Sequence, residues 1–135
     1  MFFSGFGGFK FTQKARVKKT IRYFKDRINF MNQLHHEIDL FIKRCKKNNL
    51  KPCLRLNGTS DISYENYKFD NGLNIFECFK DLQFYDYTKV DKRMSKYLKG
   101  ELPNNYHLTF SRDEDNQFKV IETLNNGGNV AVVFL

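Results

Sequence analysis

The sequence predicts an α/β fold: an open, mostly parallel four-stranded sheet, like part of a β/α barrel, that follows two N-terminal helices. Three observations support this prediction. Apolar residues recur at helical spacing over the first 50 residues, and after Pro52 strand-like and helix-like segments alternate. The last segment, NVAVVFL, is nearly all apolar, which is typical of a parallel strand covered on both faces. Together these patterns indicate right-handed βαβ units.

The length of 135 residues predicts a single domain with one hydrophobic core. We expect a Phe/Gly-rich N-terminal arm at residues 1–11 and one α/β domain at 12–135. Within that domain, a basic helical part at 12–50 precedes β/α repeats at 51–135. The phenylalanines of the arm are expected to cover the core. The alternative is that they stack on nucleic-acid bases, because every base presents a π-face.

The first helix is predicted at residues 12–27, with Thr12 as its N-cap. Four apolar side chains, three or four residues apart, form one stripe along this helix. The stripe consists of Val17, Ile21, Phe24 and Ile28.

A second apolar stripe runs from Met31 to Cys45 and predicts a helix at residues 31–48. Either Asn29 or Asn32 is expected to cap its start. One long, kinked helix in place of the two is the alternative.

After Pro52, three short helices separate four predicted strands. The helices lie in LNIFECFKDL, in DKRMSKYLKG and in NQFKVIETLNNGG. The apolar residues expected to pack from the third helix are Phe118, Val120, Ile121 and Leu124. The strands are predicted near residues 53–57, 83–88, 105–110 and 129–134.

Positive charge is concentrated in the first part of the chain. The formal net charge is +8, and residues 1–55 hold 14 Lys/Arg against 3 Asp/Glu, whereas residues 56–135 hold 9 against 12. This asymmetry indicates a surface that faces a polyanion, although a solvated helical face and the helix dipole are the structural alternatives. The candidate binding residues are Lys14, Lys18, Lys19, Arg22, Lys25, Lys43, Arg44, Lys46 and Lys47.

Polar residues also follow the first three predicted strands at the point where each strand ends. The carboxyl ends of parallel strands share one edge of a sheet, and ligand sites of β/α folds form there. Helix capping is the alternative explanation, because Asp and Ser are good N-caps. The strand-end cluster consists of Asn57, Thr59, Ser60, Asp61, Asp86, Thr88, Lys89, Ser111 and Arg112.

Cysteine and histidine spacing predicts no metal site. The three cysteines form no CxxC pair and no zinc-finger spacing with histidine, so we expect reduced thiols, with Cys53 and Cys78 in the core. No nucleotide-binding or hydrolase motif occurs, and we expect no cofactor. Without an apolar run of about 18 residues or a leader-like start, neither secretion nor membrane insertion is expected.

Four segments resemble successive strand-end motifs of a family of phage and plasmid proteins: RLNGTSDISYE, FYDYTK, YHLTFSRDE and GGNVAVVF. The resemblance covers roughly residues 12–135, and those proteins in turn resemble radical-SAM-like partial α/β barrels. Two departures stand out. This chain lacks their cysteine cluster before the first helix, and it ends at Leu135 where they continue. The resemblance therefore implies a truncated member without the thiolates that hold an iron–sulfur cluster.

The preferred function is a non-enzymatic binding protein of a phage or mobile element, acting in the cytoplasm of the host cell. Its basic helices would engage nucleic acid or a ribonucleoprotein, and inhibition of a host defence complex of the CRISPR type would suit a short gene of this kind. No membrane partner is expected. The exposed edge of a half-barrel would be covered by the N-terminal arm or by a second copy in a homodimer.

The alternative function is an enzyme acting on a phosphorylated or nucleotide substrate at the carboxyl ends of the strands. Lys89 and Arg112 would hold the phosphate, and Asp61 or Asp86 would serve as base or metal ligand. The sequence favours the binding protein, because these carboxylates have no accompanying nucleophile or known catalytic spacing.

Overall fold

A computed structural model describes residues 10–58 and 60–134 of the chain. Most of the predicted N-terminal arm, residues 1–9, lies outside the described residues. The chain divides into two compact units, Met1–Leu50 and Lys51–Leu135, and each is described by itself. The single domain at 12–135 stays a prediction.

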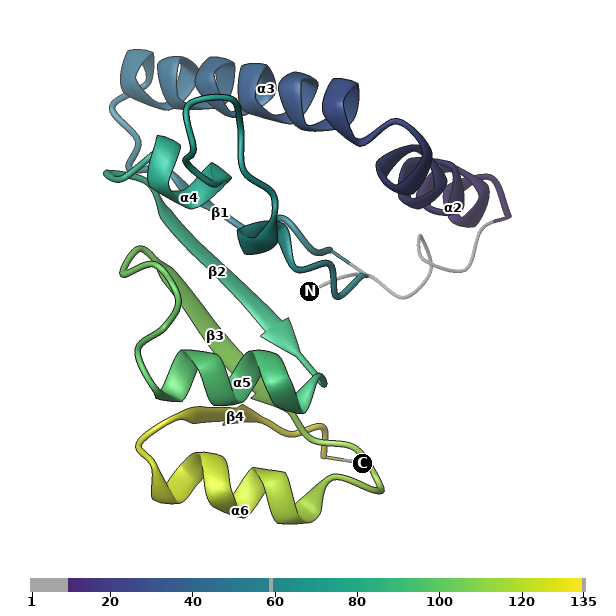
Figure 1. Cartoon of the computed structure of the whole chain (residues 1–135), viewed down its shortest axis with the longest axis vertical. Helices are drawn as coiled ribbons and strands as arrows, with labels where there is room; N and C mark the ends of the chain where they lie inside the picture. Colours follow the sequence, from purple (N-terminus) through teal and green to yellow (C-terminus); the bar gives the residue numbers. More distant parts are fainter. Residues whose placement is uncertain (1–9, 59, 135) are drawn as a thin grey trace. The chain divides into compact units, whose positions relative to one another are not determined.

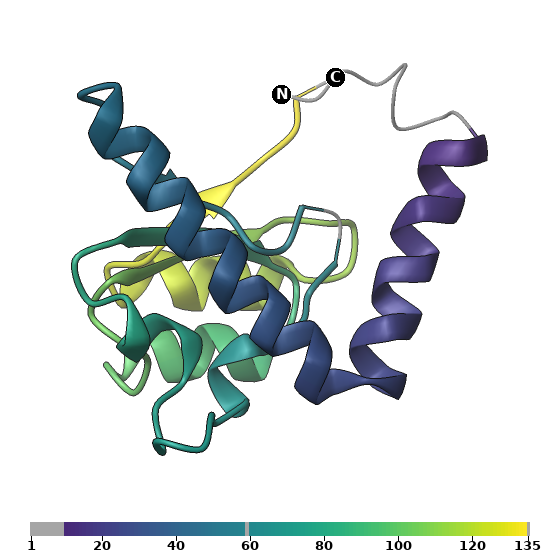
Figure 2. The same ribbon diagram turned by 90° about the horizontal axis from the view of Figure 1, so that it is seen from above.

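The first unit contains helices α2 (Lys10–Lys25) and α3 (Arg27–Lys47), which meet at a sharp bend (Figures 1 and 2). The prediction of two helices is therefore confirmed, and the alternative of one long helix is not. Asp26 breaks the helical path, with φ −136° and ψ 58°, and lies at the N-cap position of α3.

The predicted helix caps are wrong. Thr12 lies inside α2, because that helix begins upstream at Lys10. Asn29 and Asn32 both lie inside α3, where the Asn29 amide donates to the Asp26 carboxylate at 3.1 Å. The apolar periodicity shows where the helices run, but it does not mark the residue at which backbone torsions leave the helical region.

The second unit is built on a four-stranded, all-parallel sheet with strand order β1-β2-β3-β4, which confirms the predicted fold class. Adjacent strands in the sheet are also consecutive in the chain (Figure 1). The strands are β1 (Cys53–Leu54), β2 (Gln83–Thr88), β3 (Tyr106–Ser111) and β4 (Asn129–Ala131).

The two outer strands are shorter than predicted. β1 ends at Leu54, and three residues later the Asn57 side chain bonds to a loop. β4 ends at Ala131, and Val133 and Phe134 beyond it are exposed. The nearly all-apolar segment NVAVVFL is therefore not a strand covered on both faces over its whole length.

Three helices and one 3-10 turn connect the strands: η1 (Tyr64–Asn66), α4 (Ile75–Cys78), α5 (Asp91–Leu98) and α6 (Gln117–Asn125). Asn74 and Glu77 form a reciprocal capping box that starts α4. The core lies where these helices meet one face of the sheet. That face presents Phe84, Asp86, Thr88, Tyr106, Leu108 and Phe110, all of them buried.

The packing of α6 differs from the prediction. Its buried side chains are Lys119, Val120 and Thr123. Phe118, Ile121 and Leu124, which we expected in the core, are exposed. Gly128 lies close to this buried face, where an added Cβ would lie 2.7 Å from the Thr123 methyl group.

The helices of this unit leave most of the opposite face of the sheet uncovered, and the Tyr97 ring of α5 reaches it at His107. Gln83, Tyr85 and Tyr87 alternate with the buried residues of β2 and are exposed. Cys53 pairs in register with Gln83 and is exposed on the same face, whereas Cys78 is half-buried and Cys45 of α3 is buried. The expectation that Cys53 and Cys78 lie in the core is therefore wrong.

None of the helices in the described part of the chain is long and apolar enough to cross a membrane.

Candidate functional site

The structure brings much of the predicted strand-end cluster together. Asn57 and Ser60 lie after β1, and Asp86 and Thr88 come from β2. Thr59 lies outside the described residues. Ser111 and Arg112 do not join the others: the Ser111 carbonyl accepts a hydrogen bond from Asn116, and the Arg112 backbone N–H donates to Ala131 of β4.

Asn57 organises the run of small polar residues that follows β1. Its side chain is fully buried, and its Oδ1 accepts from the Ser60 hydroxyl at 2.8 Å and from the Ile62 backbone N–H at 2.9 Å. Its Nδ2 donates to the Ile62 carbonyl at 2.9 Å and to Asp86 Oδ2 at 2.7 Å. One asparagine thus closes the loop and ties it to β2.

Asp61 joins the same loop to the start of α5. Its carboxylate accepts from the Thr88 hydroxyl at 2.7 and 2.8 Å and from the Lys89 backbone N–H at 3.0 Å. It also forms an ion pair with Arg93 of α5. Lys89 therefore contributes its backbone to the cluster, whereas its predicted role rested on its amine.

Arg93 lies at the centre of the buried network. It is 4% exposed, and its guanidinium donates to both carboxylate oxygens of Glu65 at 3.2 Å as well as to the Tyr106 hydroxyl. The Tyr106 hydroxyl in turn donates to Asp86 Oδ2 at 3.1 Å. Phe76 of α4 stacks on the Tyr106 ring, with centroids 4.2 Å apart.

Burial sets the protonation behaviour of this network. It raises the pKa of Asp86, against hydrogen bonds from Asn57 and Tyr106 that lower it. It also raises the pKa of Tyr106, opposed by the charge of Arg93. For Arg93, burial would lower the pKa, but Tyr106 and the carboxylate of Glu65 outweigh it, so the guanidinium stays charged.

The chemistry available to the cluster is limited by its internal partners. Asp86 is 1% exposed, and the four polar atoms of the Asn57 and Asp86 side chains all take part in hydrogen bonds within the unit. A substrate would have to displace these partners to reach either group. Among the described residues, no group of three or more His, Cys, Asp or Glu side chains could hold a metal ion.

The basic helix α2 forms a second candidate site. Its sixteen residues include seven Lys/Arg and no Asp or Glu. Lys14, Lys18, Arg22 and Lys25 are exposed, and in the described part of the chain none of them forms an ion pair. The guanidinium carbon of Arg22 lies 6.0 Å from the centroid of the Phe30 ring.

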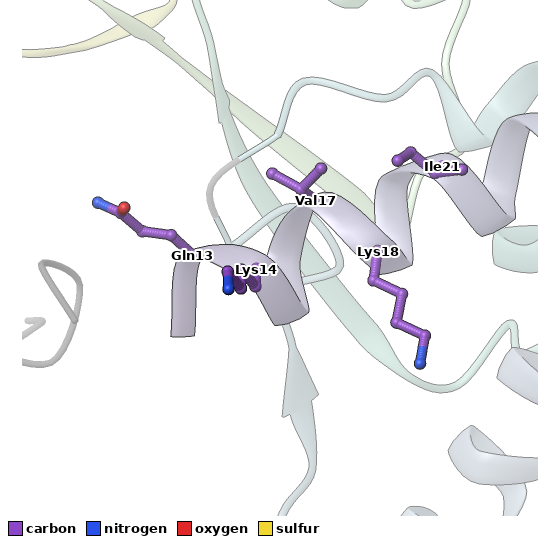
Figure 3. A pocket seen from close by; sticks show the side chains of 5 residues that line it. All are labelled: Gln13, Lys14, Val17, Lys18 and Ile21. Atoms are coloured by element: carbon purple, nitrogen blue, oxygen red, sulfur yellow. The ribbon is translucent and has the colours of Figure 1, made fainter. Parts of the chain in front are cut away.

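The apolar stripe predicted for the first helix is exposed beside these cations, and its last residue, Ile28, lies in α3. Val17, Ile21, Phe24 and Ile28 are between 46% and 66% exposed. A pocket of about 480 Å³ is lined by Gln13, Lys14, Val17, Lys18 and Ile21. Figure 3 shows Val17 and Ile21 on one side of the helix and the Lys18 side chain extending from another. The helix therefore presents exposed apolar side chains beside its cations.

The predicted cations at the end of α3 are also exposed, but each has a structural explanation. Lys43 pairs with Asp39 one turn earlier at 3.1 Å. Arg44, Lys46 and Lys47 lie in the last turn, where positive charge complements the helix dipole. We therefore assign α2 the larger share of unpaired charge.

Comparison with known proteins places the chain in a family. The model of a phage-type family described as Gene product 88 matches residues 3–135. The chain belongs to the gene product 88 family. No curated protein and no solved structure was found to match the chain. The comparisons thus support the phage part of the predicted resemblance and give no support for its radical-SAM part.

The sequence analysis did not predict four residues of the buried network around Asp86 and Arg93. They are Arg55, Glu65, Arg93 and Tyr106. The helical periodicity could have indicated Arg93. It lies one turn before Tyr97 and beside Met94 in a short amphipathic helix, at a position that faces the core. No comparable signal marks Glu65, because it lies in a 3-10 turn that the periodicity does not predict.

Proposed function

We propose that this gene product 88 family chain is a non-enzymatic binding protein that engages nucleic acid or a ribonucleoprotein through α2. The observation that carries the proposal is the charge of this helix, seven Lys/Arg with no carboxylate. A solvated surface helix usually interleaves acids with bases, because i,i+4 pairs stabilise it. A helix with cations alone is better matched to a phosphate backbone, from which it releases condensed counterions.

The strand-end carboxylates favour binding over catalysis. Asp61 and Asp86 are held by Thr88, Arg93, Asn57 and Tyr106, which is the pattern of a structural network. Lys89 and Arg112, the predicted phosphate clamp, do not meet at one point of that network. These contacts support the binding protein over the enzyme on a phosphorylated substrate.

The biological setting follows from the family. Membership of a phage-type family supports action in the cytoplasm of an infected host cell, and inhibition of a CRISPR-type defence complex is the role we propose there. Descent from a radical-SAM-like barrel that has lost its reactive centre remains part of this proposal, and it rests on the parallel strand order and the strand-end motifs. A homodimer is proposed as a further way to cover the sheet edge.

The test is charge reversal on α2. The variant Lys14→Glu, Lys18→Glu, Arg22→Glu, Lys25→Glu should abolish binding of a labelled duplex and leave the thermal unfolding transition in place. Wild-type affinity should fall steeply with salt, by roughly 10³ between about 50 and 200 mM for about six phosphate contacts. Fluorescence anisotropy measures both effects.

The matched control reverses four exposed lysines of the second unit, with the same change in net charge. This variant is Lys80→Glu, Lys92→Glu, Lys96→Glu, Lys99→Glu, and it should retain most of the affinity. If both variants lost affinity equally, the loss would be due to net charge alone, and α2 would be rejected as the binding site. Copurified nucleic acid or Cas protein from the native host would identify the partner.

A further inference from the structure

The uncovered face of the sheet presents two tyrosines side by side along one strand. Tyr85 and Tyr87 are two residues apart in β2, so both rings project from the same face, and each is 38% exposed. In register, Tyr85 lies opposite His107 and Tyr87 opposite Thr109 of β3. Parallel sheets are usually covered on both faces, so two exposed aromatic rings here require an explanation.

A cation and polar groups flank these rings. The Arg55 guanidinium carbon lies 4.8 Å from the centroid of the Tyr87 ring. Across the sheet, Asn129 Nδ2 lies 3.2 Å from His107 Nε2, and the Tyr97 ring of α5 meets the His107 ring edge-on. Because these contacts orient Arg55, Tyr87 and His107, the surface is ordered before any ligand arrives.

The charge of this face differs from that of the unit that carries it. Residues 51–135 contain 11 Lys/Arg and 12 Asp/Glu. None of the residues that β1 to β4 place on the uncovered face is acidic. Arg55 lies beside them, and its Nε also pairs with the buried Asp86 carboxylate at 3.4 Å. The residues on the uncovered face are Cys53, Gln83, Tyr85, Tyr87, His107, Thr109, Ser111, Asn129 and Ala131. The face therefore suits an anionic ligand with flat rings.

The spacing of the tyrosines favours a single strand over a duplex. Alternate residues of a strand are roughly 6.6 Å apart, about twice the 3.4 Å rise of stacked bases. Two neighbouring bases can occupy both rings only after they have unstacked from each other, as they do in single-stranded recognition. Thr109 and Asn129 carry hydrogen-bonding side chains for base edges nearby.

We propose that this uncovered face binds single-stranded nucleic acid by stacking bases on Tyr85 and Tyr87, with Arg55 and His107 beside them. The inference rests on the proposed function, which it deepens by naming the form of nucleic acid and a second contact surface. Stacking on aromatic rings is tolerant of base sequence, so the surface selects for unpaired strands over duplexes and not for a motif.

The first experiment compares single-stranded and duplex oligonucleotides of about 12 nucleotides on the full chain, a length within the range of known single-strand sites. The variant Tyr85→Leu, Tyr87→Leu should bind the single strand roughly tenfold more weakly for each stack that is lost and bind the duplex as the wild type does. Tyr85→Phe, Tyr87→Phe keeps both rings and should retain affinity. Phe118→Leu, which alters an aromatic residue that is 84% exposed on α6, should have no effect.

The second experiment uses the free thiol of Cys53, which is exposed on the same face. Bound single strand should slow its alkylation, measured by mass spectrometry, and should leave the rate at the half-buried Cys78 unchanged. This readout locates the ligand and does not depend on whether a variant folds. Equal rates at Cys53 with and without the oligonucleotide would overturn the proposal.

The outcomes separate the two proposals. Wild-type affinity for the single strand in the double leucine variant would overturn the stacking surface and leave α2 untouched. Loss of single-strand binding in that variant, with no effect of charge reversal on α2, would reject the proposed role of α2 and support this surface. An equal loss in Phe118→Leu, or a wild type that binds neither oligonucleotide, would overturn the stacking surface.

Discussion

At the scale of single residues, Arg93 decides how the second unit is held together. It is the buried cation between Asp61, which precedes it by 32 residues in the sequence, and Glu65, which precedes it by 28. Buried ion pairs add little stability compared with apolar replacements, but removing one partner leaves an uncompensated charge. The network therefore makes the second unit sensitive to substitution at Arg93.

Arg93→Met is expected to lower the free energy of unfolding by about 3–5 kcal/mol, because Glu65 stays buried without its cation. Urea unfolding at neutral pH measures the change. Lys92→Met at the exposed neighbouring position should change the free energy by less than about 0.5 kcal/mol. A loss below about 1 kcal/mol for Arg93→Met would show that the network carries little of the stability.

Asp86 should make the protein less stable as pH rises from acid toward neutral. Burial raises the pKa of its carboxyl group, so the folded protein keeps this proton where the unfolded chain, with a pKa of about 3.9, has lost it. The free energy of unfolding then falls with rising pH until the folded pKa is passed. Urea unfolding of the wild type and of Asp86→Asn, compared between about pH 4 and pH 7, should show the wild type losing stability relative to the variant. A relative gain would contradict the direction of the shift.

At the scale of elements, α2 and the two central strands differ in how they are stabilised. Among the α2 side chains described from Gln13 to Lys25, only Tyr23 is buried, and Arg27 stacks on its ring at 4.7 Å. In β2 and β3, every second side chain is buried. A helix of this length without a buried face has little intrinsic stability in water, so the nucleic acid that we propose as its ligand would help to order it.

Backbone amides of α2 are therefore expected to exchange with deuterium faster than those of β2 and β3. Local opening of weakly packed elements requires less free energy than global unfolding, which limits exchange in a core strand. Hydrogen exchange followed by mass spectrometry tests this. Added nucleic acid should slow exchange in α2, and protection of free α2 equal to that of β2 would contradict the expectation.

At the scale of the whole molecule, the net positive charge is carried by the first unit. Residues 1–50 hold 12 Lys/Arg against 3 Asp/Glu, and residues 51–135 hold 11 against 12. The first unit can supply electrostatic attraction that is independent of base sequence, and the second can supply rings for unpaired bases. This division is why the two proposed surfaces can be removed separately by mutation.

The sequence by itself determined the class and order of the elements. Apolar spacing located α2 and α3, and the alternation after Pro52 located β2 and β3 within a residue of their observed bounds. The run Asn57 to Asp61 correctly indicated that polar groups of the first two strands meet. These features depend on neighbours within a few residues, and periodicity reports such local constraints directly.

Only the tertiary structure decided which of these faces meet. Periodicity placed Phe118, Ile121 and Leu124 on one side of α6, yet that side is exposed and Lys119 and Thr123 are buried. It also could not assign Arg93 to Asp61 and Glu65, or leave Tyr85 and Tyr87 uncovered. A pattern shows which residues share a face of one element, whereas the element that packs against that face is set by contacts between residues far apart in the chain.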